Sequence, residues 1–203
     1  HHPIPVLIYH DVATSTQMHD SYTVETTLLA RELDHLKSEG YTPLSFATAT
    51  TLRETHQLPK KPIIISFDDA LPGQRLALDM LKAREMPATF FIASDLVGDA
   101  VHLNWTDVRA IAAAGMEIGG HTAHHTHVSE LDETGLENEI VGDKRHIEAE
   151  LGREISVFAY PFRELTENAQ TYVDQAGYTV VRDTAAYKST VMTNSFDAFL
   201  KAI

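Results

Sequence analysis

The run Ile63-Ile64-Ile65-Ser66-Phe67, followed directly by Asp68-Asp69, is the segment from which the architecture can be built. A short, mostly apolar run of this kind is typical of a strand that is buried on both faces, as strands of parallel sheets are. Two carboxylates stand where this strand ends. We therefore predict a buried strand over residues 63–67 that brings two acidic side chains to one edge of a sheet.

The same arrangement of helix, breaker and strand recurs along the chain. Leu29, Leu33 and Leu36 repeat at helical spacing and stop at Gly40, just before the next apolar segment. Short strands separated mostly by helices are the pattern of a parallel sheet that is covered on its faces. A closed or nearly closed β/α barrel fits this pattern best. The predicted strands cover residues 6–9, 41–46, 63–67, 88–92, 117–120, 156–160 and 178–181.

Composition limits the possible functions. The chain has 203 residues, of which 43% are apolar and 22% are charged, so we expect one domain over residues 1–203. A formal net charge of -13 disfavours nucleic acid and anionic membrane surfaces as partners. The absence of cysteine excludes disulfides and thiolate chemistry, and no stretch is long and apolar enough for a transmembrane segment. Residues 1–5 lack the basic and apolar regions of a signal peptide, so we expect any export signal to be removed or absent, and we do not expect His1 or His2 to be ligands.

Polar residues follow the predicted strands at their C-terminal ends. In β/α barrels this rim carries the chemistry, while the opposite rim mainly holds the fold together. The spacing therefore predicts a single pocket. The residues concerned are His10-Asp11, Asp68-Asp69, His121, Phe162-Arg163 and Arg182-Asp183.

One carboxylate and two imidazoles form a ligand set that suits Zn²⁺ or a similar divalent ion and leaves a position open for water. The segment from His121 to His125 supplies the imidazoles, and one carboxylate of the Asp68-Asp69 pair completes the set while the other serves as a base. This predicts a metal-assisted hydrolase.

Other interpretations of the same residues stay open. The Asp-Asp pair could start a turn or cap a helix, and a histidine-rich stretch is often a solvated loop. His10 could be an ordinary strand-end histidine, and we interpret Trp105 as a packing residue rather than a sugar platform.

Five motifs, in order, resemble those of the polysaccharide deacetylases of carbohydrate esterase family 4, the NodB-homology domain. The resemblance covers most of the chain. It implies an incomplete (β/α)7 barrel, a divalent metal and hydrolysis of N-acetyl groups from N-acetylglucosamine units. The motifs are Tyr9-His10-Asp11-Val12 (YHxV), Ser66-Phe67-Asp68-Asp69 (TFDD), Ala88-Thr89-Phe90-Phe91 (ATFF), His121-Thr122-Ala123-His124-His125 (H-[ST]-x-x-H) and Phe158-Ala159-Tyr160-Pro161-Phe162 (FAYP[FY]).

Carried over to this chain, the resemblance implies a role for each residue. Asp69, His121 and His125 would bind the metal, with Zn²⁺ as the first choice and Co²⁺ or Ni²⁺ as alternatives. Asp68 would be the base that takes a proton from the activated water. His10 would be the acid, since the chain has no C-terminal L-x-H motif. The segment Tyr160-Pro161-Phe162 would contact the substrate.

The resemblance also implies the partner and the compartment. The partner would be an N-acetylated glycan, and the protein would act outside the cytoplasm, in the periplasm, at the cell surface or in the medium. The alternatives are a small-molecule amidohydrolase or an O-acetyl xylan esterase with the same metal site, and a non-catalytic glycan-binding protein.

The chain departs from the family pattern in places. Residues 70–73 replace the Gly-Tyr that usually follows the Asp pair, and Ala159 stands where the wider family has an arginine. Arg163 and Arg182 are the two candidates for orienting Asp68 in its place. Arg163 also occupies a position where glycine is usual. The segment 183–203 permits no interpretation.

Overall fold

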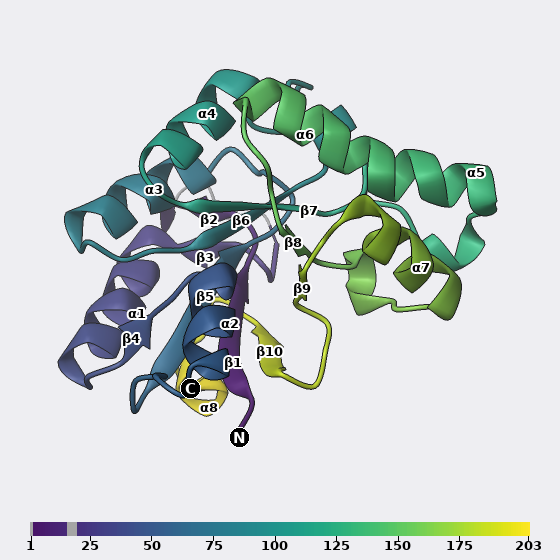
Figure 1. Ribbon diagram of the computed structural model, residues 1–203. Coiled ribbons are helices and arrows are strands. Elements are labelled where there is room, and N and C mark those ends of the chain that lie inside the picture. Colours follow the sequence, from purple (N-terminus) through teal and green to yellow (C-terminus); the bar gives the residue numbers. More distant parts are fainter. Residues whose placement is uncertain (1, 16–19) are drawn as a thin grey trace.

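The computed structural model describes residues 2–15 and 20–203, and His1 lies outside this range. The chain forms a mostly parallel sheet that curls into an open half-barrel, with helices packed around it (Figure 1). The elements are β1 (Ile4–Tyr9), β2 (Val12–Ala13), β3 (Val24–Glu25), α1 (Thr26–Ser38), β4 (Thr42–Pro43), α2 (Phe46–Glu54), β5 (Pro62–Phe67), α3 (Gln74–Ala83), β6 (Thr89–Ile92), α4 (Trp105–Ala113), β7 (Glu117–Gly120), α5 (Glu133–Leu136), α6 (Asp143–Leu151), β8 (Val157–Phe158), α7 (Glu167–Ala176), β9 (Val180–Val181), β10 (Tyr187–Val191) and α8 (Phe196–Ala202).

All seven predicted strands are present, and the main sheet has the order β10-β1-β5-β6-β7-β8-β9, with β4 paired to the start of β5. Each pairing between the described strands is parallel. No pairing joins β9 to β10 within the described residues, so the barrel stays open along that seam. The predicted incomplete (β/α)7 barrel is confirmed.

Two parts of the sequence interpretation were wrong or incomplete. The strand expected over residues 41–46 ends at Pro43, because Ser45 accepts a hydrogen bond from the Thr48 N–H and starts α2. The segment 183–203, which the sequence left without an interpretation, supplies β10 beside β1 and the helix α8.

Alternation along the strands divides the core into an inner and an outer layer. Ile4, Val6 and Ile8 of β1 belong to the cluster inside the barrel, together with Ile64 of β5. Leu7 and Tyr9 belong to the cluster beneath the surrounding helices. Because successive side chains of a strand point to opposite faces, the inward series continues past the strand ends to His10 and Asp68.

The same alternation applies to the other strands. Val180 of β9 packs inside the barrel, and Arg182 is the next residue on that face. A Cβ on Gly119 of β7 would meet Phe91 and Val157 inside the barrel, which places His121 on the inner face as well. Strand parity therefore aims His121 and Arg182, like His10 and Asp68, into the mouth of the barrel.

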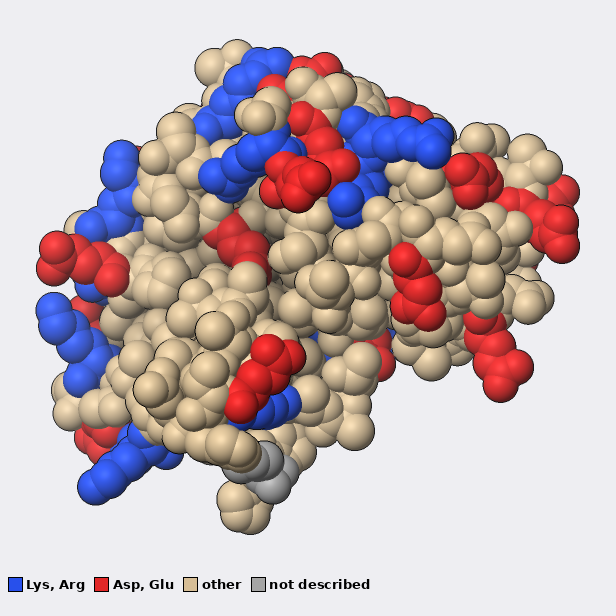
Figure 2. Space-filling model, in the orientation of Figure 1, with Lys and Arg blue, Asp and Glu red and all other residues tan. Residues whose placement is uncertain are grey.

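None of the helices in the described part of the chain has the length and hydrophobicity of a membrane span. Figure 2 shows Lys and Arg side chains interspersed with Asp and Glu on one face of the molecule, with no continuous basic surface there.

Candidate active site

A cavity of about 410 Å³ opens at the C-terminal ends of the strands. Strands far apart in the sequence supply its walls, as the sequence predicted for this rim. The residues that line it include His10, Tyr22, Asp68, Asp69, His121, His125, Tyr160, Phe162, Arg163 and Arg182. Seven of the eight residues that the sequence assigned to the site therefore line one cavity, and the eighth, Pro161, is buried and is not among the lining residues.

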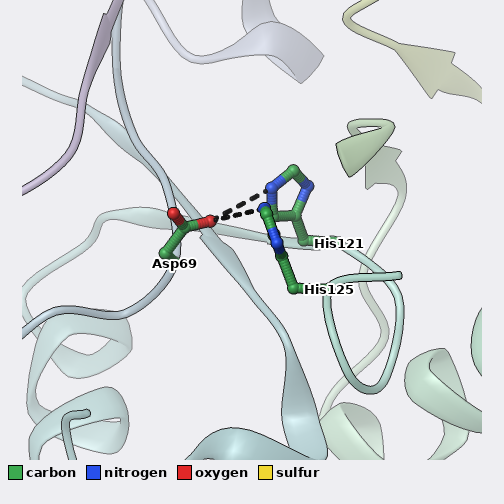
Figure 3. Close-up of side chains that lie close together, drawn as sticks. All are labelled: Asp69, His121 and His125. Carbon is green, nitrogen blue, oxygen red and sulfur yellow. Dashed lines mark ion pairs between the residues drawn. The ribbon is translucent and has the colours of Figure 1, made fainter. Parts of the chain in front are cut away.

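Asp69, His121 and His125 come together as a set that could hold a metal ion. One ligand atom from each lies within 4.8 Å of the others. Asp69 Oδ1 is 3.3 Å from His121 Nε2 and 3.2 Å from His125 Nε2, and Figure 3 shows both rings facing this oxygen. His124 lies outside this set, as predicted, because its ring contacts Glu139 and Asp95 instead.

The chemistry of this set fits a divalent ion. Asp69 Oδ1 is buried and accepts no hydrogen bond within the described residues. The His121 Nδ1 donates to the carbonyl oxygen of Ala159 at 2.7 Å, which leaves Nε2 as the free acceptor nitrogen facing Asp69. A buried acceptor oxygen that faces an acceptor nitrogen is unfavourable unless a cation or a proton lies between them.

Asp69 reaches the set through unusual backbone geometry. Strand alternation directs Asp68 inward and would direct Asp69 outward. The φ angle of Asp69 is 76°, in the left-handed region, and that of His125 is 54°. The backbone therefore leaves the regular strand path at the residues that supply two of the three candidate ligands.

Arg182 forms a bidentate ion pair with Asp68. Arg182 Nη1 donates to Oδ1 at 2.6 Å and Nη2 donates to Oδ2 at 2.8 Å, and both side chains are buried. Burial alone would raise the pKa of Asp68, but the guanidinium and nearby His121 outweigh that effect and hold the pKa below its usual value. Arg182, rather than Arg163, orients Asp68.

The other carboxylate of the pair is also ionised at neutral pH. Burial would raise the pKa of Asp69, but the adjacent imidazoles of His121 and His125 hold that pKa well below its usual range. The two adjacent aspartates therefore do not share a proton.

His10 lies across the cavity from the imidazole pair. Its Nε2 is 3.9 Å from Asp69 Oδ2, and its Nδ1 is buried without a hydrogen-bond partner within the described residues. Gln74, fully buried, donates from Nε2 to the backbone oxygens of both His10 and Asp68, at 3.0 and 2.7 Å. This side chain couples the end of β1 to the end of β5.

The loop after β8 forms another wall. The Tyr160 side chain is buried at the cavity wall and its hydroxyl donates to Gln170. The Tyr160 N–H donates to Asp183, whereas the Phe162 N–H has no hydrogen-bond acceptor within the described chain. The Phe162 ring is 55% exposed and stacks on His127.

Sequence reasoning missed two buried acids that support the site. Asp143 accepts hydrogen bonds from the backbone N–H groups of Ser94 and His121. Glu139 accepts from the backbone N–H and the ring of His124. A signal was available, because Leu136, Ile140 and Ile147 mark one helical face and Asp143 lies on it; an acid on an apolar face is seldom without partners.

The fold and the site together define a class, an open β/α barrel with a carboxylate and two imidazoles gathered at the C-terminal ends of its strands. The sequence matches the polysaccharide deacetylase family over residues 55–181, and the chain belongs to that family. The family is one of hydrolases.

Individual relatives agree with this assignment. The chain is 25% identical over 170 residues to a peptidoglycan-N-acetylglucosamine deacetylase of Bacillus cereus, covering 77% of this chain and 60% of that protein. It spans about 60% of the length of the curated relatives it matches.

Solved structures share the fold over almost the whole chain. The Streptococcus pyogenes deacetylase PplD, in complex with acetate, superimposes with a TM-score of 0.87 at 20% identity and covers 98% of this chain and 97% of its own. IcaB from Ammonifex degensii superimposes with a TM-score of 0.85 at 23% identity and covers 99% of this chain and 95% of its own.

Proposed function

We propose that the protein is a metal-dependent N-deacetylase that hydrolyses acetamido groups of N-acetylglucosamine units in a polysaccharide. The observation that carries this proposal is the cavity in which an ionised, arginine-held Asp68 lies beside the Asp69, His121 and His125 set, with His10 opposite. These are the parts that amide hydrolysis needs: a cation site, a base and an acid.

Asp69, His121 and His125 would hold the ion, which we assign as Zn²⁺, with Co²⁺ or Ni²⁺ as alternatives. Such an ion, when bound, lowers the pKa of a water molecule and polarises the acetyl carbonyl. The left-handed backbone at Asp69 and His125 keeps the two ligands in place before the ion arrives.

Asp68 acts as the base in this proposal. Its carboxylate is ionised at neutral pH, because Arg182 holds its pKa low, and it lies 3.7 Å from the His121 Nε2 that faces the cation site. It takes the proton of the attacking water. The free N–H of Phe162 then donates to the acetyl oxygen as negative charge develops there, a contribution of about 3–4 kcal/mol in comparable sites.

His10 supplies the proton for the departing amine. An amine leaves poorly without that proton, and histidine is the side chain best suited to give and regain one near neutral pH. The Gln74 hydrogen bonds keep His10 and Asp68 at a fixed spacing on two sides of the scissile bond.

The cavity rim favours a polymer as the substrate. Tyr22 and Phe162 are 52% and 55% exposed, and both line the mouth of the cavity. Exposed aromatic rings at a binding site offer apolar faces on which sugar rings stack. A small-molecule enzyme would be expected to enclose its ligand instead. With a glycan of the cell wall or of an exopolysaccharide as its substrate, the protein would act outside the cytoplasm, in the periplasm, at the cell surface or in the medium.

The proposal is tested by acetate release from N-acetylglucosamine oligomers, with Zn²⁺-, Co²⁺- or Ni²⁺-loaded protein and a chelated sample alongside. We expect metal-dependent release, loss of metal and activity in Asp69→Ala, and retained metal without turnover in Asp68→Asn. His102→Ala, which removes an imidazole outside the cavity, is the matched control. Bound metal without release would favour a glycan-binding protein, and release from acetylated xylan alone would favour an esterase.

A further inference from the structure

Arg163 has a backbone conformation that arginine rarely adopts. Its φ is 55°, and that of Phe162 before it is 58°, so two consecutive residues without glycine lie in the left-handed region. Such strain is unfavourable, and strained residues cluster at active sites and ligand-binding sites. The Arg163 side chain is exposed and lines the active-site cavity.

Arg163 is also a cation without a committed partner. It forms no ion pair or hydrogen bond through its side chain within the described residues, although the sequence has 29 acidic residues. The other arginine of the cavity is occupied, because Arg182 uses both Nη atoms to hold Asp68. Arg163 is therefore the positive charge of this cavity that is available to a ligand.

A second cavity, of about 260 Å³, adjoins the first and shares Arg163 and Arg182 with it. Three polar side-chain atoms of its lining residues are buried and have no hydrogen-bond partner among the described residues, namely Arg182 Nε, Asp183 Oδ1 and Ser189 Oγ. The other carboxylate oxygen of Asp183, Oδ2, accepts a hydrogen bond from the Tyr160 N–H. Buried polar atoms of this kind require a ligand or water as a partner.

We propose that Arg163 and this second cavity form a subsite for a sugar unit next to the one that is deacetylated, and that Arg163 binds an anionic group on that unit, a carboxylate or a phosphate. The guanidinium matches the geometry of either anion through two parallel hydrogen bonds. Ser189, Arg182 and Asp183 make the lining of this second cavity polar, as a sugar subsite requires. The inference rests on the proposed function, because it names the substrate class of the same site.

The test compares matched glycans on the metal-loaded enzyme. One oligosaccharide alternates N-acetylglucosamine with a carboxylated N-acetyl sugar, a second is its methyl ester, and a third carries a phosphate at the neighbouring unit. We expect kcat/KM about fivefold higher for the carboxylate than for its ester, as a partly exposed charge pair provides, and a preference that falls with salt. Comparison of the carboxylate with the phosphate identifies the anion.

Variants then test whether Arg163 causes the preference for the carboxylate over its methyl ester. Arg163→Gly should bring the ratio of the two kcat/KM values close to one, and Arg163→Lys should keep part of it. Arg145→Ala removes the same charge from an exposed position of α6 outside the cavities and should leave the ratio unchanged. A ratio of one in the wild type, or a preference that survives in Arg163→Gly, would overturn the subsite.

A binding measurement tests the subsite separately from the deacetylase activity. If the loaded wild-type protein releases no acetate from any of these glycans, the deacetylase proposal fails. Calorimetric titration with the carboxylate and its methyl ester still decides the subsite, because an affinity difference that Arg163→Gly abolishes supports it and equal affinities refute it.

Discussion

Replacing Arg182 by methionine should both destabilise the fold and impair Asp68 as the catalytic base. Arg182 and Asp68 are 1% and 4% exposed, and their two hydrogen bonds are 2.6 and 2.8 Å long. Removing one partner of a buried pair leaves an uncompensated charge, at a cost of about 3–5 kcal/mol. For a chain of this length that loss lowers the unfolding midpoint by about 10 °C.

The pH dependence follows from the sign of the pKa shift. The folded-state pKa of Asp68 lies below its unfolded value, so the pair stabilises the protein above that unfolded value and loses its effect as pH falls through the folded pKa. Without Arg182, the effect of burial, which raises the pKa of Asp68, is opposed less, so a smaller fraction of the base is ionised at neutral pH. We expect kcat to fall by about 10²- to 10³-fold with metal retained.

Urea unfolding with a chelator present measures the stability change at pH 7 and at lower pH. The double variant Asp68→Asn/Arg182→Met should recover most of the stability, and Arg75→Met, which breaks an exposed pair with Asp107, should lose less than about 1 kcal/mol. A loss below about 1 kcal/mol in Arg182→Met, or an unchanged kcat, would refute the reasoning.

Three further changes test other parts of the structure. His10→Ala should lower kcat at neutral pH by about 10²-fold with metal content unchanged by mass spectrometry, and an unchanged kcat eliminates His10 as the acid. Burial raises the pKa of Glu32 to about 7. The buried Glu32 carboxyl therefore destabilises the folded state increasingly as pH rises from about 4.5 to 7. Glu32→Gln should therefore be more stable than the wild type by about 2–3 kcal/mol at pH 8 in urea unfolding and close to it near pH 4.5, whereas a gap that does not change with pH contradicts this assignment. Arg163→Gly relieves a residue with a φ of 55° and should raise the unfolding midpoint by about 2–4 °C in a thermal scan, and a lower midpoint means that the backbone there is unstrained.

The sequence predicted most of the barrel because its inner strands are apolar on both faces. Residues 63–67 could hardly be anything other than a buried strand, and strand parity then directs Asp68 inward. The edge strand β10 gave no such signal. Its residues Tyr187–Val191 are only partly buried and include Lys188, Ser189 and Thr190, so no apolar run marks the strand.

Local sequence patterns could not show whether Arg163 or Arg182 orients Asp68. Arg182 meets Asp68 across 114 positions of sequence, and their contact depends on β9 and β5 facing each other over the barrel interior. Periodicity could have shown that Arg182 follows Val180 on the inner face. It could not show which carboxylate that face would reach.

The ligand loops need more than their own residues to hold their shape. Asp69, Thr122 and His125 all have positive φ angles, and each costs of the order of 1–3 kcal/mol unless the surroundings impose it. The helical segment that follows these loops holds the backbone of the histidine loop beside these residues. Asp143 accepts hydrogen bonds from the backbone N–H groups of Ser94 and His121, and Glu139 accepts one from the backbone N–H of His124. Both acids belong to a helical stretch that includes a π-helical turn over Glu137–Gly142. A π turn shifts the helix register by one residue, so both acids can face the loops while the apolar face stays packed. These acids therefore support the site, although neither belongs to the candidate ligand set.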